Sequence, residues 1–181
     1  MKENSVDFIT TYSKVRFSPF SPDASMIKLV DIAHALSLLC RANGHFERFF
    51  SVAQHSINCA NEARARGYSK RVVLACLLHD ASEAYISDIT RPVKKNLLEY
   101  AAVETKMQNC IWKAFRISLN QEEMKLVYAV DDAMLYAEFD ALMGEKVFPD
   151  APEIISRPDF SEKDFKTVEQ EFVMNCMELM G

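Results

Sequence analysis

Residues 77–85 read Leu-Leu-His-Asp-Ala-Ser-Glu-Ala-Tyr, which places a histidine and an aspartate directly behind an apolar run. Polar side chains are expensive to bury at such a place unless a partner satisfies them. A divalent metal ion is such a partner, because imidazole nitrogen and carboxylate oxygen together suit Mn, Fe, Co, Ni or Zn. We therefore expect His79 and Asp80 to bind a metal ion.

The remaining metal ligands must come from other helices, because adjacent residues on a helix point about 100° apart. Two residues on apolar helix faces are candidates: His55, and Asp131 in the stripe from Val127 to Leu135. A lone His55 would more often be a core histidine, and it is the His79-Asp80 pair that favours ligation. Asp132 competes with Asp131, but only Asp131 shares the apolar line of its helix.

Two further carboxylates accompany the histidine–aspartate pair. Glu83 follows Asp80 by three residues and His79 by four, which places it on the same helix face, and Asp88 follows in a loop. The chemistry that needs this set is hydrolysis, in which a metal ion lowers the pKa of water and a non-ligating carboxylate positions or deprotonates that water. A nearby cation would offset the remaining phosphoryl charge.

This pattern resembles the HD-domain phosphohydrolases, and among them the small 5′-deoxynucleotidase-like enzymes and the phage nucleotide (dNTP) phosphohydrolases. The resemblance covers about residues 27 to 143. The segments that carry it are Asp31-Ile32-Ala33-His34-Ala35-Leu36-Ser37, Asn43-Gly44-His45, Ser51-Val52-Ala53-Gln54-His55-Ser56, His79-Asp80 with Glu83 and Asp88, and Val130-Asp131. It implies one divalent ion (Mn, Co, Fe, Ni, Zn or Mg) held by His55, His79, Asp80 and Asp131, with Glu83 and Asp88 as catalytic carboxylates.

The resemblance also implies that Arg41, which precedes the first ligand helix, contacts the phosphate. Lys94 is the second candidate for phosphate binding, with an exposed surface role as its alternative, and Arg41 could instead end its helix favourably as a C-terminal cation. His45 lies in a loop near the expected pocket mouth, where substrate contact and loop packing are both open. Relatives commonly place an aromatic residue after the arginine, whereas this chain has Ala42, so a ring that would pack the sugar or base is missing or supplied elsewhere, which weakens any transfer of base specificity.

Apolar periodicity predicts an all-α fold, a compact HD-type helical bundle formed by residues 1–181 as a single domain. The motif-bearing core spans about residues 27–143, and the first twenty-five residues are expected to be irregular, without strand pairs. The predicted helices run from about Met26 to a stop at Asn43-Gly44, Ser51 to Gly67, Ser69 to Tyr85, Val93 to Phe115, Asn120 to Gly144, and 161–180. A connector from Phe148 to Pro158 precedes the last helix, for which Ser161 and Asp164 resemble a capping box.

The amino-acid composition and net charge favour some classes of protein and argue against others. Apolar residues make up 49% of the 181 residues, with only four glycines and six prolines, which favours a packed helical body. The formal net charge of −5 argues against a nucleic-acid polymer or an anionic membrane as partner. The start lacks a signal-peptide pattern, and the five cysteines form no C-x-x-C pair, so we expect buried thiols in a cytoplasmic protein rather than disulfides or zinc ligands.

The resulting prediction is a 5′-(deoxy)nucleotidase that releases phosphate from nucleoside monophosphates. The alternative within enzymes is a dNTP triphosphohydrolase, such as a dATPase, which releases tripolyphosphate from the same type of site. From a different class, a metal-containing module that senses nucleotides without turnover stays open. Relatives tend to be dimers or larger, and the aromatic N-terminal segment and Met-rich last helix could supply a contact, so a homo-oligomer is expected.

Overall fold

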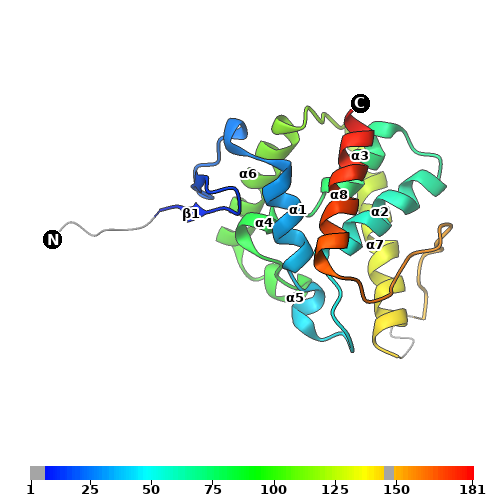
Figure 1. Ribbon diagram of the computed structural model, residues 1–181. Helices are drawn as coiled ribbons and strands as arrows, with labels where there is room; N and C mark the ends of the chain where they lie inside the picture. The colour runs from blue at the N-terminus through cyan, green and yellow to red at the C-terminus, as the bar shows by residue number, and fades with distance from the viewer. Residues whose placement is uncertain (1–6, 145–148) are drawn as a thin grey trace.

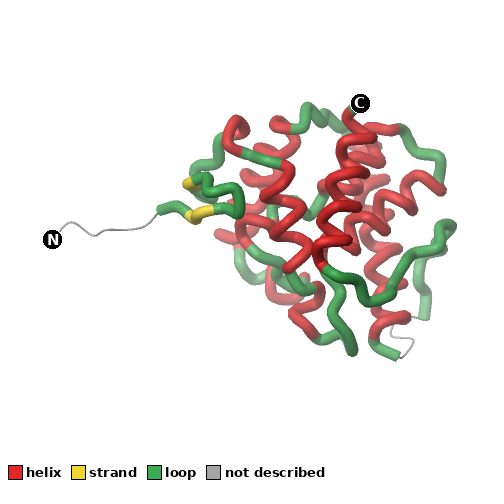
Figure 2. The backbone as a smooth tube through the Cα atoms, in the orientation of Figure 1, coloured by secondary structure: helices red, strands yellow, loops and turns green. Residues whose placement is uncertain are grey.

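The computed structural model describes residues 7–144 and 149–181, and most of them are helical (Figure 2). The expected all-α class is confirmed. The 3₁₀ and α-helices are η1 Ala24–Met26, α1 Leu29–Leu38, η2 Arg41–Gly44, α2 Val52–Ala65, α3 Lys70–Leu78, α4 Glu83–Ile86, α5 Arg91–Lys94, α6 Leu98–Ala114, α7 Gln121–Leu142 and α8 Phe165–Met180. Within the described ranges, no helix is long and apolar enough to cross a membrane.

Helices α2 and α3 form the centre of the bundle. They pack on each other, and both contact α7 and α8, while α1 lies beside α8 on the face shown in Figure 1. Nearly every residue of α2 is buried, and small side chains such as Ala53, Ser56 and Ala60 let neighbouring helices approach closely. His55, in the first turn of α2, is fully buried.

Side-chain caps fix where the two site-bearing long helices begin. Ser51 accepts a hydrogen bond from the Gln54 backbone and Gln54 reaches back to the Ser51 backbone, a capping box that starts α2. Asn120 and Glu123 form the same reciprocal pair at the start of α7. The predicted starts of both helices are confirmed, and the caps set the rotation at which each helix presents its polar residues.

The first predicted helix is wrong at its C-terminal end. Helix α1 ends at Leu38, and the chain then turns extended: Val52 N–H donates to the Leu39 carbonyl at 3.0 Å and Arg41 N–H donates to the Phe50 carbonyl at 2.8 Å. This backbone pairing breaks the helix before Arg41 and carries that residue inward on the separate turn η2. Periodicity could not reveal it, because the pairing partners lie nine and thirteen residues further along the chain.

The third predicted helix is also shorter than expected, since α3 ends at Leu78 and residues 79–82 form a turn before α4. Gln108 of α6 explains the break. Its amide nitrogen donates to the Leu78 carbonyl at 2.8 Å, and its amide oxygen accepts from Ser82 N–H at 3.2 Å. A side chain from α6 therefore replaces helical partners and holds the turn that presents His79 and Asp80.

Two further helix boundaries differ from the sequence prediction. The segment expected as one helix from Val93 to Phe115 is split into α5 and α6, because Leu97 has a non-helical backbone conformation. Helix α8 begins after Asp164, whose side chain accepts from Lys166 N–H, so Asp164 is the N-cap and Ser161 is not. The start of the predicted connector, Phe148, lies outside the described residues.

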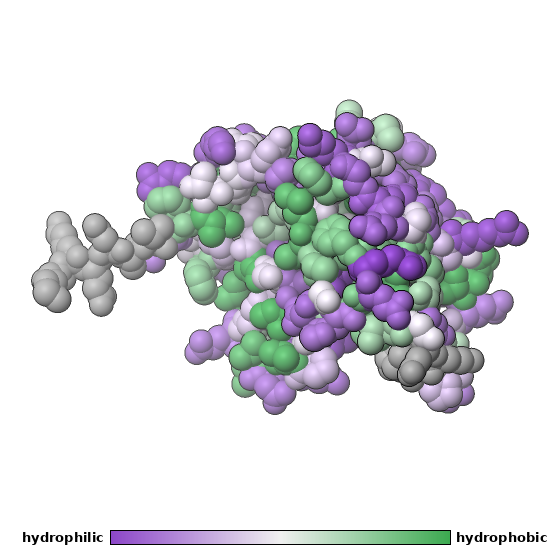
Figure 3. All heavy atoms as spheres, turned by 60° about the horizontal axis from the view of Figure 1, so that its bottom comes forward, coloured by the Kyte–Doolittle hydropathy of each residue, from purple (hydrophilic) through white to green (hydrophobic). Residues whose placement is uncertain are grey.

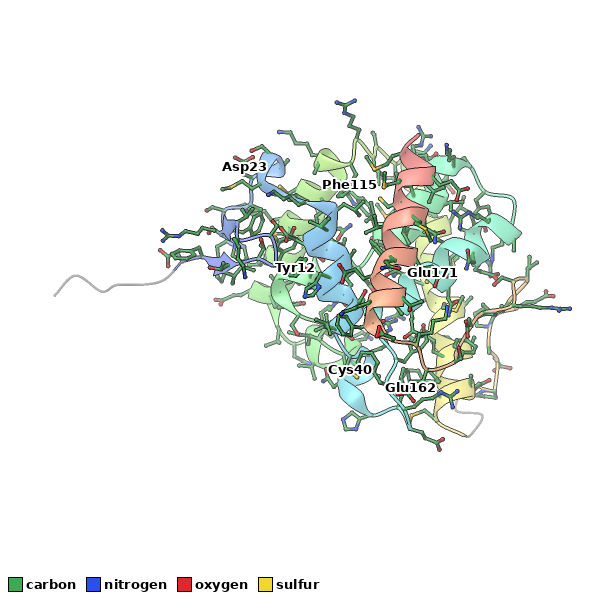
Figure 4. All side chains as sticks on the ribbon, in the orientation of Figure 1. Tyr12, Asp23, Cys40, Phe115, Glu162 and Glu171 are labelled. Atoms are coloured by element: carbon green, nitrogen blue, oxygen red, sulfur yellow. The ribbon has the colours of Figure 1, made fainter. Side chains whose placement is uncertain are left out.

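The N-terminal segment contains a short hairpin that the sequence did not predict. Strand β1, Ile9–Thr10, pairs antiparallel with β2, Arg16–Phe17. Phe17 is fully buried and anchors the hairpin on the bundle. Tyr12, labelled in Figure 4 beside α1, stacks on His34 with ring centroids 3.7 Å apart, and His34 also contacts Glu169 of α8. These contacts place His34 in the packing between the N-terminal segment, α1 and α8.

Glu62 of α2 fastens the connector that leads to α8, and its removal should destabilise the protein. This fully buried carboxylate accepts from the backbone N–H groups of Ile155 at 3.1 Å and Ser156 at 2.8 Å, and from Arg66 at 2.7 Å. Glu62→Ala should lower the free energy of unfolding by about 2–3 kcal/mol, because two partly buried backbone N–H groups and Arg66 lose a charged acceptor. Urea denaturation measures the change, with Glu153→Ala as the exposed control; an equal, small effect of both variants would contradict the prediction.

Candidate metal centre and adjoining pocket

The four side chains predicted as metal ligands converge from three parts of the fold: α2, the turn after α3, and α7. His55 Nε2 lies 3.2 Å from His79 Nε2, 3.2 Å from Asp131 Oδ1 and 3.5 Å from Asp80 Oδ2. His79 Nε2 lies 3.3 Å from the same Asp80 oxygen and 3.5 Å from the same Asp131 oxygen. Four donor atoms thus gather in a cluster no wider than one coordination sphere.

The outward-facing nitrogen of each histidine determines what the inward-facing nitrogen can do. His55 Nδ1 lies 2.6 Å from the Glu138 carboxylate, and His79 Nδ1 lies 2.8 Å from the Cys76 carbonyl. Both partners only accept hydrogen bonds, so each Nδ1 carries a hydrogen, and Nε2 is the nitrogen of each ring that can lose its proton to an incoming ion. Two such nitrogens and two carboxylate oxygens close to one another make a donor set that fits a divalent cation.

The structure distinguishes the two adjacent aspartates of α7. Asp131 directs one oxygen to His55 and His79 and the other to Arg91, whose Nη2 lies 2.6 Å away. Asp132 pairs with Arg91 as well, at 2.5 Å, but no contact joins it to either histidine and its side chain is 50% exposed. The position expected for the fourth ligand is therefore that of Asp131.

The pKa is shifted down for two carboxyl groups of the site, Asp80 and Asp131, and up for two others, Glu83 and Asp88. Burial raises the pKa of Asp131, but hydrogen bonds from His55 and His79 outweigh it and hold that pKa well below its ordinary value. The pKa of Asp80 is also lowered, because the charges of His79 and Arg41 outweigh burial. Charged carboxylates of this kind are suited to ligate a cation.

Glu83 and Asp88 behave in the opposite way. Burial and then the neighbouring Asp80 and Asp88 charges raise the pKa of Glu83 well above its ordinary value, and burial likewise raises the pKa of Asp88. Glu83 is 3% exposed, and its Oε2 atom is buried without a hydrogen-bond partner. A carboxyl group that lies beside the cluster with a raised pKa and an open oxygen is suited to exchange protons.

A pocket of about 440 Å³ opens beside the cluster and is lined by most of the predicted functional residues. Asp80, Glu83, Asp88 and Asp131 form part of its wall, and Arg41 and Lys94 supply positive charge. His45 is exposed and is not among the lining residues, so the structure does not bring it to the pocket. The aromatic residue that Ala42 does not provide comes from α7 instead, where Tyr136 and Phe139 line the pocket.

Arg41 is a central component of the site rather than a helix-ending cation. Its guanidinium lies 3.2 Å from His55 Nε2, 3.3 Å from Glu138 Oε2 and 3.4 Å from Asp80 Oδ2. Figure 4 labels its neighbour Cys40 just below the end of α1, where the chain enters η2. Lys94 pairs mainly with Glu104 at 2.5 Å and reaches Glu83 at 3.8 Å, which places its charge between α6 and the pocket.

Two side chains at the centre, Glu138 and Cys59, were not among the residues predicted for the site. Glu138 follows Asp131 by seven residues, two helical turns, so its place in the same stripe was the available signal. Cys59 follows His55 by four, and its Sγ lies 3.5 Å from His55 Nε2. The prediction of buried thiols holds for Cys59, Cys76 and Cys176, whereas Cys40 and Cys110 are partly exposed. Burial raises the pKa of Cys59 to about 11.

Glu138 should control metal affinity without touching the metal. It is fully buried, and its two oxygens orient His55 and Arg41. Glu138→Ala should weaken divalent-ion binding roughly 10- to 100-fold, because His55 loses the partner that fixes its ring and hydrogen. Calorimetric titration with Mn²⁺ measures the affinity, with the exposed Glu122→Ala on the same helix as control. Unchanged Mn²⁺ affinity in a folded Glu138→Ala protein would show that Glu138 does not control metal binding.

Comparison with known proteins finds similarity in the part of the chain that carries the metal centre. A family model described as HD domain matches residues 41–151, a range that begins at Arg41 and includes all the cluster residues. YfdR, an uncharacterised protein of Escherichia coli K12, is 36% identical over 106 residues, covering 59% of this chain and 57% of that protein. An uncharacterised protein of Rhodobacter capsulatus is 39% identical over 84 residues, 44% of this chain and 42% of its own. The matches thus span about half the length of these relatives.

Proposed function

This chain belongs to the HD-domain superfamily of metal-dependent phosphohydrolases, and we propose that it hydrolyses the phosphoester of nucleoside or deoxynucleoside monophosphates. The observation that carries the proposal is the pair of carboxyl groups with raised pKa, Glu83 and Asp88, beside a donor cluster that already contains two charged carboxylates. A metal site that only held helices together would have no use for them.

In the proposed reaction, His55, His79, Asp80 and Asp131 would hold one divalent ion, which when bound would offset phosphoryl charge and lower the pKa of a nearby water. Glu83 accepts a proton from the attacking water as the water oxygen bonds to phosphorus. The ester P–O bond breaks, and the nucleoside oxygen takes up the proton that Glu83 received, while Asp88 assists this transfer or orients the water.

The remaining lining residues position the substrate. Arg41 contacts the ligand cluster and also lines the pocket, so its guanidinium lies close enough to the pocket to contact a phosphoryl oxygen. Lys94 adds a second positive charge close to Glu83. Tyr136 and Phe139 offer ring surface on the α7 side, where a sugar or base would lie. A phosphate group bound by Arg41 would thus lie in the pocket that Glu83 also lines.

Hydrolysis of a deoxynucleoside triphosphate to tripolyphosphate is the second candidate. It is favoured by Arg91, which joins Arg41 and Lys94 in the pocket lining and extends the line of positive charge. Each of these cations is already paired with at least one carboxylate in the structure. That pairing leaves less positive charge available for a long phosphate chain, and we therefore favour the monophosphate.

Product analysis tests the proposal. Metal-stripped protein is supplied with Mn²⁺, Co²⁺ or Mg²⁺ and a panel of nucleoside and deoxynucleoside mono- and triphosphates. Metal-dependent release of orthophosphate from monophosphates is the expected result. Tripolyphosphate from triphosphates alone would establish the second candidate instead. Tight metal and nucleotide binding with no product from any nucleotide would overturn both and point to a sensing module.

The proposed partner is a free nucleotide rather than a nucleic-acid polymer or a membrane. We also propose self-association into a dimer or larger oligomer, supported by Met174 and Met177 of α8, each with 64% exposure. On the face drawn in Figure 3, apolar and hydrophilic side chains are interspersed rather than gathered into one patch. Sedimentation equilibrium tests this proposal by measuring the molecular mass in solution. The mass of a monomer at tens of micromolar protein would exclude the oligomer.

A further inference from the structure

The thiol of Cys59 lies in the same cluster of donor atoms as the two histidines. Cys59 Sγ is 3.5 Å from His55 Nε2, and the donor atoms of Cys59, His55 and His79 all lie within 4.8 Å of one another. Cys59 is fully buried, one helical turn after His55 on α2. Nothing in the proposed hydrolysis uses this sulfur.

Two of the separations in this group match those of coordinated atoms. With Zn–N bonds of about 2.0–2.1 Å and Zn–S bonds of about 2.3 Å, tetrahedral ligands lie about 3.3 Å apart for two nitrogens and about 3.6 Å for nitrogen and sulfur. The observed separations are 3.2 Å between the two Nε2 atoms and 3.5 Å between His55 Nε2 and the sulfur, which also lies 3.9 Å from His55 Nδ1. The sulfur thus lies beside the His55 ring, and a rotation of the Cys59 side chain toward the Nε2 side would bring all three atoms to one ion.

The chemistry of the donors separates two kinds of ion. Thiolate and imidazole suit soft or borderline ions such as Zn²⁺ and Cd²⁺, whereas carboxylate oxygens suit harder ions such as Mn²⁺ and Mg²⁺. In this centre the carboxylates of Asp80 and Asp131 contact the histidines at 3.2–3.5 Å, which is also the separation of the sulfur from His55. The two histidines thus have both the carboxylates and the thiol within reach as possible co-ligands.

We propose that Cys59 is a ligand for soft divalent ions at this centre, binding Zn²⁺ or Cd²⁺ together with His55 and His79, while hard ions use the histidines and the two aspartates. The inference rests on the metal centre of the proposed function but adds a residue outside its ligand set. When the sulfur–metal bond forms, the thiol proton passes to solvent, and no electron is transferred. The choice of ion would then depend on one buried sulfur atom.

Cadmium binding tests the proposal without any measure of activity, because a cadmium–thiolate bond produces a charge-transfer absorption in the ultraviolet. One equivalent of Cd²⁺ is added to metal-stripped wild-type protein, to Cys59→Ala, to Cys59→Ser, and to Cys176→Ala as a matched control. Cys176 is likewise buried, but its sulfur contacts Met180 and not the histidines. Difference spectra against each metal-free protein isolate the band.

The expected result is a band in wild type and Cys176→Ala that is absent from both Cys59 variants. Cd²⁺ affinity should fall roughly tenfold or more in Cys59→Ser, while Mn²⁺ affinity changes less than about twofold. Circular dichroism and thermal melts verify that the variants are folded. A band that persists in folded Cys59→Ala, or no band in wild type that binds Cd²⁺, would overturn the inference. Normal Mn²⁺ binding in that protein would leave the proposed function intact.

Discussion

Asp131→Asn is expected to abolish tight binding of the divalent ion and to reduce phosphate release more than about a hundredfold, whereas Asp132→Asn leaves both nearly unchanged. The two residues are adjacent on α7, carry the same side chain and both pair with Arg91, yet only Asp131 faces the histidines. Removing its charge takes away one of the two carboxylate ligands, so less negative charge would remain to offset a bound divalent ion.

Two measurements establish the result for this pair of variants. Metal content after gel filtration with excess Mn²⁺ reports binding, and orthophosphate release from a deoxynucleoside monophosphate reports turnover. Because the substitution preserves side-chain shape, both proteins should melt at similar temperatures when metal-free. Equal loss in the two variants, or a greater loss in Asp132→Asn, would show that the fourth ligand has been misassigned.

Glu83→Gln is expected to lower kcat by about 10²- to 10⁴-fold while Mn²⁺ still binds. Glutamine keeps the size of the side chain but cannot accept the proton of the attacking water. Metal binding should persist because Glu83 is not among the four donor atoms of the cluster. Steady-state kinetics and Mn²⁺ titration separate these effects, with the exposed Glu99→Gln of α6 as control. Loss of Mn²⁺ binding in folded Glu83→Gln would make Glu83 a ligand instead.

The pH dependence of wild-type kcat gives the same residue an independent signature. Burial and the charges of Asp80 and Asp88 raise the pKa of Glu83, so its carboxyl group gains a proton at a higher pH than an ordinary glutamate does. As a base it must be deprotonated, and activity should therefore fall as the pH drops through this raised pKa. The residual activity of Glu83→Gln should lack that acidic limb. A profile unchanged by the substitution would assign the limb to another group.

The helices that carry the site could be predicted because their signals are local. Ser51 and Asn120 cap α2 and α7, and apolar stripes continue from those caps past His55 and Asp131. The turn after Leu78 could not be predicted in this way, since it depends on the amide of Gln108 thirty residues later. Arg41 was expected on a helix for the same reason, because backbone pairing with Phe50 has no periodic signal.

The site residues also divide into those with a local sequence signal and those placed by contacts between distant parts of the chain. His79, Asp80 and Glu83 are neighbours in the sequence, so their chemistry was readable from one short stretch. Glu138 and Cys59 act through contacts with His55 that follow from how α7 and α2 are rotated in the bundle. Tyr136 and Phe139 supply ring surface from a helix that the sequence connected only with metal binding. Apart from the stripe position of Glu138, sequence patterns gave no signal for these contacts.

The central claim is that one divalent ion, held by His55, His79, Asp80 and Asp131, enables this protein to hydrolyse nucleotides. The most direct test adds Mn²⁺ stepwise to metal-stripped protein and follows bound metal and orthophosphate release from a deoxynucleoside monophosphate in the same samples. The account predicts no release without metal and a rise in proportion to bound Mn²⁺ that levels off at one ion per chain. Full release from stripped protein, or none from protein that has bound its ion, would contradict it.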